Sequence, residues 1–85
     1  MQQFSHTIND PNGIHARPAG LLAQTMQGFK STITISKDGQ SASAKHLIGL
    51  MKMRLKCGQT FTLTADGEDE AAAIEAAKTF LASNL

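Results

Sequence analysis

The sequence predicts an α+β fold in which helices cover one face of a four-stranded sheet, giving a two-layer open-faced sandwich. Four segments alternate apolar and polar residues with a period of two, which is typical of strands that bury one face. Two longer segments repeat their apolar residues every three or four positions, which is typical of amphipathic helices. With 85 residues, 41% hydrophobic and 18% charged, we expect residues 1–85 to form a single domain with one thin core.

The first half of the chain predicts a strand, a turn and a helix. The strand is indicated by alternation at Phe4, His6 and Ile8. DPNG at 10–13 is a turn cluster, and Pro18 is expected to open the helix that follows. The core-facing positions of that helix recur at three- and four-residue steps: Ala19, Leu22, Met26 and Phe29. Gly28 stands near its expected end.

The second half predicts a hairpin, a short helix, a strand and a final helix. Asp38-Gly39 is a two-residue hairpin turn between two strands. KHLIGLMKMRL, at 45–55, is apolar and short, as expected for one or two helical turns. The last strand alternates at Phe61, Leu63 and Ala65, and the acids of ADGEDE suit a helix N-terminus. The final helix carries an apolar stripe: Ala73, Ile74, Ala77, Phe80 and Leu81. Periodicity does not give the strand order, so another ferredoxin-like arrangement remains open.

Charge is unevenly distributed although the formal net charge is only +1. Residues 45–56 contain four basic side chains and no acidic one: Lys45, Lys52, Arg54 and Lys56. This favours an acidic partner surface or a phosphorylated ligand, the alternative being a solvated face. There is no RNP-like aromatic pattern and no overall basic charge, so we expect no nucleic-acid partner.

Several other classes are disfavoured by what the sequence lacks. No signal peptide is visible, and no apolar run approaches the roughly 18 residues that span a bilayer. We therefore expect a cytoplasmic protein without membrane insertion. The single Cys57 cannot form an internal disulfide and is expected in a small packed position, while His6 fills a partly covered strand position. No His or Cys pair has metal-ligand spacing, and no P-loop or GxGxxG appears, so no metal and no cofactor are predicted.

The stretch NGIHARPAG, at 12–20, places His15 and Arg17 at the start of the first predicted helix. Unpaired N–H groups and the helix dipole make that position favourable for an anion and unfavourable for a histidinium. His15 is therefore biased toward the neutral, nucleophilic imidazole, and Arg17 can bind phosphoryl oxygens through its forked guanidinium. Gly13 lets the loop turn before His15. These residues suit a reversible phosphoryl site, with His15 as a plain helix cap as the alternative.

NGIHARPAG resembles the phosphocarrier motif of HPr, the histidine-containing protein of the bacterial phosphoenolpyruvate:sugar phosphotransferase system. The resemblance extends over essentially the whole chain, including the Asp38-Gly39 hairpin, AKHLIGLM and TADGEDE. It implies an antiparallel sheet of order 1-4-2-3. It also implies that His15 accepts phosphate on Nδ1, the pros nitrogen, from phosphorylated enzyme I and passes it to sugar-specific A domains of permeases, with Arg17 stabilising the phosphate. Such a chain is a phosphotransfer intermediate rather than a stand-alone enzyme, and we expect a monomer.

The resemblance also gives a role to the short apolar segment. Leu47, Ile48 and Met51 coincide with positions by which HPr proteins dock enzyme I and the A domains; we call these three residues the docking patch. Basic residues are expected around it: Lys45, Lys52 and Arg54. Three neighbours on the same segment are expected in the core instead: Leu50, Met53 and Leu55.

Two positions depart from the family pattern. Many HPr proteins carry a regulatory serine at the N-cap of the short helix, where this chain has His46, so we expect no control by a serine kinase. Arg54 stands where relatives often have glycine. Two further functions remain open: a regulatory binding module of the same fold without obligatory phosphotransfer, and a plain interaction module. A pure binder requires neither His15 nor Arg17, so their presence together favours the phosphocarrier.

Overall fold

The predicted order of strands and helices is confirmed. The computed structural model describes residues 1–13 and 16–84, and for Asn84 the backbone only. The elements are β1 (Gln2–Thr7), α1 (Ala16–Gln27), β2 (Thr32–Lys37), β3 (Gln40–Ser43), α2 (Leu47–Lys52), β4 (Thr60–Asp66) and α3 (Glu70–Asn84). The predicted acceptor His15 lies outside the described residues.

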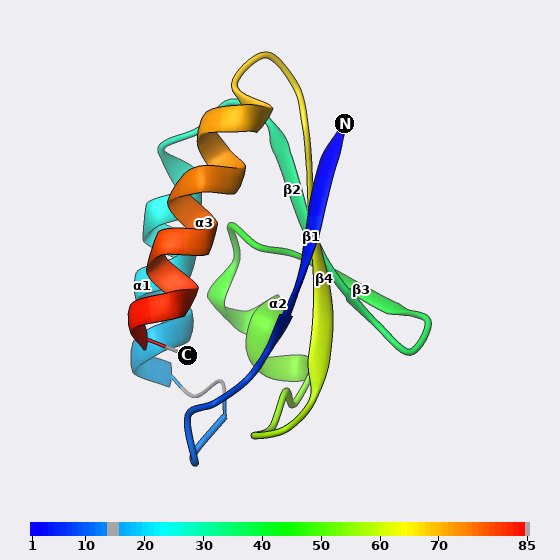
Figure 1. The fold of residues 1–85 in the computed structure, drawn as a ribbon, viewed down its shortest axis with the longest axis vertical. Coiled ribbons are helices and arrows are strands. Elements are labelled where there is room, and N and C mark those ends of the chain that lie inside the picture. Colours follow the sequence, from blue (N-terminus) through cyan, green and yellow to red (C-terminus); the bar gives the residue numbers. More distant parts are fainter. Residues whose placement is uncertain (14–15, 85) are drawn as a thin grey trace.

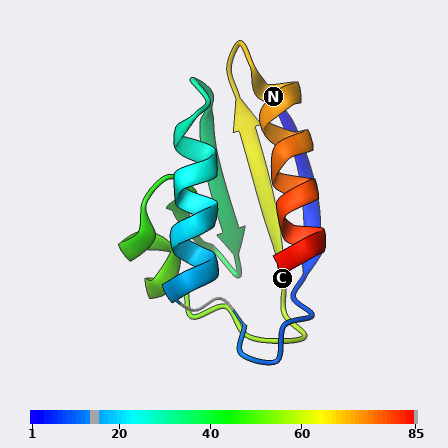
Figure 2. The same ribbon diagram turned by 90° about the vertical axis from the view of Figure 1, so that its left-hand side faces the viewer.

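The four strands form an antiparallel sheet of order β1-β4-β2-β3, as the family resemblance implied. Helices α1 and α3 lie side by side over one face of this sheet, and α2 lies beside the lower half of α1 (Figures 1 and 2). The two-layer open-faced sandwich is therefore confirmed.

The uncovered face of the sheet is lined by hydroxyl side chains. The register places Ser5, Thr62, Ser36 and Ser41 in one row across the four strands. Thr7 and Thr60 share a hydrogen bond of 2.8 Å between their hydroxyl oxygens on the same face. Hydroxyls can both donate to and accept from water, so this face remains solvated and needs no covering helix.

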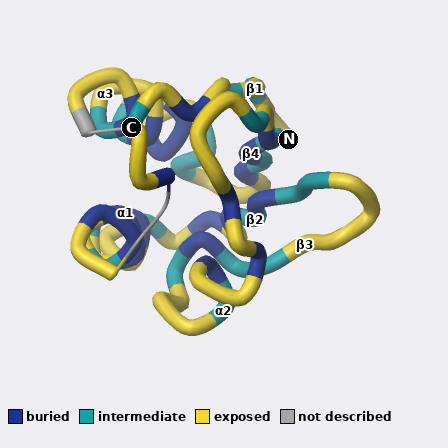
Figure 3. The backbone as a smooth tube through the Cα atoms, turned by 90° about the horizontal axis from the view of Figure 1, so that it is seen from below, coloured by how far each residue is buried: buried dark blue, intermediate teal, exposed yellow. Residues whose placement is uncertain are grey.

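The core lies between the sheet and the two long helices, where the backbone is coloured as buried in Figure 3. The central strand β4 buries all of its predicted core residues: Phe61, Leu63 and Ala65. The last helix buries most of its predicted stripe: Ala73, Ile74, Ala77 and Leu81. Phe80 is half-buried and packs at the edge of this core. The apolar faces of the strands and of the two long helices thus pack together in one core.

Two predicted positions are wrong in detail. Helix α1 begins at Ala16, so Pro18 is its third residue rather than its first. Proline fits there because the first-turn N–H groups have no partner within a helix. Cys57 is exposed rather than packed, because it lies in the loop before β4 and outside the alternation that buries that strand.

The hairpin between β2 and β3 has the predicted turn. Lys37 pairs with Gln40, leaving Asp38 and Gly39 as the two loop residues. Their φ angles are 50° and 81°, and positive φ at both positions is what a type I′ turn requires.

At the end of the molecule away from the start of α1, Asp69 joins two loops. Its carboxylate accepts hydrogen bonds from the backbone N–H of Lys30 at 2.8 Å and of Ser31 at 2.9 Å, and also from the Ser31 hydroxyl. These bonds, with the hydroxyl of Ser31 the largest cause, lower the pKa of Asp69 to about 2. The charged carboxylate therefore holds the α1–β2 loop to the start of α3.

We expect Asp69→Asn to lower stability at neutral pH and to lose that difference in acid. The pKa of Asp69 is lower in the folded state, so its contribution is present above about pH 4, the ordinary aspartate range, and is lost as the pH falls toward 2. Urea unfolding at several pH values measures this. Glu68→Gln, at an exposed neighbour, is the control. A stability difference for Asp69→Asn that persists unchanged at pH 2 would contradict the assignment.

No helix among residues 1–13 and 16–84 is long and apolar enough to cross a membrane.

Candidate functional site

The predicted phosphate site lies at the start of α1. The helix begins at Ala16, the residue that follows His15 in the chain. Arg17 is exposed in the first turn, and Pro18 and Ala19 are buried, so they fix the helix against the core. Arg17 makes no hydrogen bond or ion pair with another described side chain, which leaves its guanidinium available to an anion. First-turn N–H groups and an accessible arginine are the kinds of group that favour an anion, so the described start of α1 is compatible with the predicted phosphate site.

The loop that leads to His15 is tightly built. The Asp10 carboxylate accepts a hydrogen bond from the Asn12 N–H at 2.8 Å, and the Asp10 carbonyl accepts one from the Gly13 N–H at 2.9 Å. Gly13 is buried with φ +65°, and a Cβ added there would lie 2.4 Å from the Leu55 carbonyl oxygen. Only glycine fits this backbone conformation at this close approach. The position of the predicted turn is thus fixed up to Gly13.

The loop before β4 lies directly beside this turn. Ile8 exchanges backbone hydrogen bonds with it, donating to the Gln59 carbonyl at 2.9 Å and accepting from the Gly58 N–H at 2.8 Å. Figure 1 shows both loops at the same end of the molecule, next to the start of α1. The α2–β4 segment is therefore a neighbour of the predicted phosphate site, although the two are far apart in the sequence.

Helix α2 presents three apolar side chains to solvent, as the docking patch requires. Leu47 is 37% exposed, Ile48 is 65% exposed and Met51 is 40% exposed. The neighbours expected in the core are buried, namely Leu50, Met53 and Leu55. The division of the segment into core and surface residues is confirmed, and exposed apolar clusters of this kind are typical of protein-binding sites.

The three cations predicted around the docking patch differ in their surroundings. Lys45 is half-buried, and its ammonium donates a hydrogen bond of 2.6 Å to the Phe29 carbonyl just beyond α1. The Gln27 side-chain amide donates in turn to the Lys45 carbonyl at 2.8 Å. Lys45 therefore helps to join α1 to the segment before α2. Lys52 and Arg54 are exposed, and their charges are available to a partner.

Arg54 has an unusual backbone conformation. Its φ is 51°, and its N–H donates to the Met51 carbonyl at 3.2 Å just after α2. This left-handed position after a helix favours glycine, which accounts for the glycine that relatives often have there. A non-glycine residue is disfavoured in this conformation by about 1–2 kcal/mol.

His46 is the N-cap residue of α2, the position where many family members have a serine. Its backbone is extended (φ −122°, ψ 116°), and its side chain makes no capping hydrogen bond. The cap position was predicted correctly. The first turn of α2 is held by the backbone instead, through the Leu50 N–H and the His46 carbonyl at 3.2 Å.

Sequence reasoning missed one exposed apolar residue next to this site. Leu21 is 43% exposed on α1 and lies one turn after Arg17, on the same side of the helix. The sequence held a signal for this residue: Leu21 lies four positions after Arg17, which predicts the same side of the helix. Leu21 also lies outside the predicted apolar stripe of α1, which indicates that the core does not require it.

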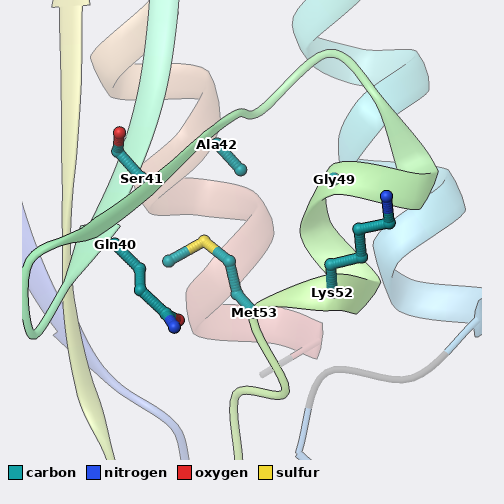
Figure 4. Close-up of a pocket in the computed structure, with 6 residues that line it drawn as sticks. All are labelled: Gln40, Ser41, Ala42, Gly49, Lys52 and Met53. Atoms are coloured by element: carbon teal, nitrogen blue, oxygen red, sulfur yellow. The ribbon is translucent and has the colours of Figure 1, made fainter.

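A shallow pocket of about 350 Å³ lies between β3 and α2 and is lined by Gln40, Ser41, Ala42, Gly49, Lys52 and Met53. Figure 4 shows Lys52 on the α2 side of this hollow and Gln40 on the β3 side. Arg17 is not among the lining residues. The pocket therefore does not include the described start of α1, and it adjoins the docking patch through α2.

His6 occupies the partly covered strand position expected of it. It is half-buried, and its ring packs against Phe61 with ring centres 5.6 Å apart. Its Nε2 is buried without a hydrogen-bond partner among the described residues. In the part of the chain that the structure describes, no three His, Cys, Asp or Glu residues lie close enough to hold a metal ion.

Comparisons with known proteins agree on one group. A family model described as the "PTS HPr component phosphorylation site", PTS being the phosphotransferase system, matches residues 2–83. The phosphocarrier protein HPr of Lysinibacillus sphaericus is 45% identical over 80 residues, which cover 94% of this chain and 89% of that protein. A multiphosphoryl transfer protein of Xanthomonas campestris is 38% identical over 74 residues, covering 87% of this chain and 9% of that protein.

A solved structure agrees in fold. The crystal structure of HPr-C-His from Thermoanaerobacter tengcongensis matches with a TM-score of 0.93 and 36% identity, covering 98% of this chain and 93% of that one. The open-faced sandwich and these similarities define a phosphotransfer protein of the phosphotransferase system. Within that class, the chain belongs to the HPr family of phosphocarriers.

Proposed function

We propose that the chain carries a phosphoryl group on His15 between phosphorylated enzyme I, charged from phosphoenolpyruvate, and sugar-specific A domains of permeases. In each transfer, the lone pair of the receiving nitrogen attacks phosphorus while the bond to the donor breaks. On this chain the receiving atom is Nδ1 of His15. The proposal includes a monomeric carrier that works in the cytoplasm and serves sugar uptake.

The observation that carries the proposal is the start of α1. The helix begins one residue after His15 in the chain, and its first turn carries an exposed Arg17 with no described partner. A phosphorylated histidine is anionic, so unpaired N–H groups and a guanidinium favour the charged form of the carrier. The family match over residues 2–83 supports this role.

Sequential transfer tests the proposed function directly. The chain is incubated with enzyme I and phosphoenolpyruvate, and a sugar-specific A domain is then added. We expect one acid-labile phosphate per chain, followed by its loss to the A domain. Binding of both partners without phosphate acceptance would instead support the regulatory binding module.

Arg17→Lys is expected to slow transfer in at least one direction with little change in stability. An ammonium keeps the positive charge but lacks the planar fork that binds two phosphoryl oxygens. Steady-state rates with the donor and the acceptor, together with the thermal midpoint, measure this. Glu75→Gln, at an exposed position of α3, is the control. Wild-type rates with both partners would contradict the role of Arg17.

The same function requires a protein-binding surface, and we propose the docking patch for it. Its three exposed apolar side chains lie on α2, which is in contact with α1. Lys45, Lys52 and Arg54 would orient acidic partners, and apolar contacts would supply affinity. Leu21, one turn after Arg17 on α1, offers a further exposed apolar side chain to a partner. Because His46 offers no hydroxyl, we propose that this surface is not regulated by a serine kinase.

Ile48→Glu is expected to weaken binding to enzyme I far more than it weakens folding. Ile48 is the most exposed residue of the docking patch, so a carboxylate there stays solvated in the free chain but repels an acidic partner. Calorimetric titration measures the affinity. Leu50→Ala, two residues on and fully buried, should instead lower stability by about 2–5 kcal/mol. Unchanged affinity for Ile48→Glu would exclude this surface from docking.

A further inference from the structure

We propose that Arg54 is a specificity-determining residue that binds a carboxylate of the partner protein at the edge of the docking patch, and that its strained backbone is retained for this contact. This inference rests on the proposed function and assigns one of its interactions to one side chain. The partner chemistry is an acidic protein surface.

The backbone of Arg54 points to a role outside the fold. Within the described residues only Asp38 and Arg54 are non-glycine residues with positive φ. Asp38 is of a type that tolerates this conformation and lies in a hairpin turn that requires it. Arginine is not a residue type that favours this conformation, and Arg54 does not lie in a hairpin turn. The side chain of Arg54 is exposed and makes no hydrogen bond or ion pair with another described residue, so no polar contact of this side chain with the described residues offsets the strain.

Arg54 lies on the segment that connects the two parts of the proposed site. It follows Met53, the C-cap residue of α2, the helix that carries the docking patch. It directly precedes Leu55 and Lys56, whose backbones pack against Gly13 in the loop before His15. The segment that contains Arg54 therefore adjoins both the docking patch and the loop before His15.

The three cations around the docking patch are not equivalent. The ammonium of Lys45 is engaged by the Phe29 carbonyl. Lys52 lines the pocket on the β3 side of α2. Arg54 is the one of the three that lies on the segment packed beside the loop before His15. Its planar fork suits a carboxylate, and an exposed charge at the rim of an interface acts mainly on orientation and encounter.

The test compares stability and transfer in the same variants. We expect Arg54→Gly to raise the urea midpoint, because glycine adopts this φ without strain. We expect the same variant to raise KM for enzyme I by roughly two- to fivefold, the range of an exposed ion pair, with kcat unchanged. Added salt should shrink the difference in KM. Arg54→Lys keeps the charge, so it should raise KM less than Arg54→Gly does. It should leave the urea midpoint unchanged.

Asp38→Gly is the matched control, because it relieves a similar backbone conformation on the β2–β3 hairpin. It should leave KM unchanged. An unchanged KM for Arg54→Gly would overturn the inference, as would an unchanged urea midpoint. A fall in kcat with KM unchanged would also overturn it, since the guanidinium would then contact the transferred phosphoryl group rather than the partner.

A second measurement separates this inference from the proposed function. Affinity for enzyme I is measured in the His15→Ala background, in which no transfer is expected, with and without Arg54→Gly. Weaker binding caused by Arg54→Gly supports the inference independently of catalysis. Phosphate acceptance by the wild type with no effect of Arg54 on affinity would overturn the inference alone. A wild type that neither binds enzyme I nor accepts phosphate would overturn both.

Discussion

Substitution of His15 by alanine is expected to abolish phosphate acceptance and to leave the fold intact. The methyl group of alanine has no lone pair with which to attack phosphorus. The core is built from strands and helices elsewhere in the chain, so a histidine between a turn and a helix contributes little to it. The measurements are labelling by enzyme I with phosphoenolpyruvate and the thermal midpoint of the variant.

His46→Ala is the control for this experiment. His46 is exposed, and its side chain makes no capping bond, so the variant should fold and accept one phosphate per chain, as the wild type does. Labelling of His15→Ala, mapped to His6 or His46, would contradict the assignment. Loss of labelling together with loss of the folded state would show that His15 has a structural role that we do not expect.

Gly13→Ala is expected to lower both stability and transfer. Alanine is disfavoured at φ +65° by about 1–2 kcal/mol, and its Cβ would also overlap the Leu55 carbonyl oxygen and the Lys56 Cα, at 2.4 Å and 2.8 Å. The loop before His15 or the loop before β4 must therefore shift. Displacement of a reacting group by about 1 Å can reduce a rate by about a hundredfold. Urea unfolding and steady-state transfer measure the two effects.

Gly39→Ala separates the effect of the positive φ from the effect of the overlap with the neighbouring loop. Gly39 also has positive φ, 81°, but an added Cβ would meet no atom within 4 Å. It should therefore show the backbone effect alone and leave transfer unchanged. If Gly13→Ala matched Gly39→Ala in both stability and transfer, the close approach of the two loops would not position the site.

The elements of the fold were predictable because each has a strong local signal. Alternation at Phe61, Leu63 and Ala65 identified the central strand, and Asp38-Gly39 identified the hairpin. These signals follow from strand geometry and from the φ angles that a tight turn demands. The strand order came from the family resemblance, because periodicity shows which face of a strand is buried but not which strand lies beside it.

The features that sequence reasoning missed depend on tertiary contacts. The bond from Lys45 to the Phe29 carbonyl joins segments that are sixteen residues apart, and no local pattern encodes it. The exposure of Cys57 follows from its loop, and Leu21 is exposed because it lies outside the buried face of α1. The positive φ of Arg54 was indicated only by the glycine of relatives. The site motif itself could be recognised, because its candidate residues stand close together in NGIHARPAG.

The most direct test of the central claim is phosphorus NMR of the chain after phosphorylation by enzyme I and phosphoenolpyruvate, with nitrogen correlation to assign the bonded atom. We expect a single acid-labile phosphoramidate on Nδ1 of His15, which disappears when a sugar-specific A domain is added. A phosphoryl group on another residue, or the absence of any phosphoramidate on a folded chain, would contradict it.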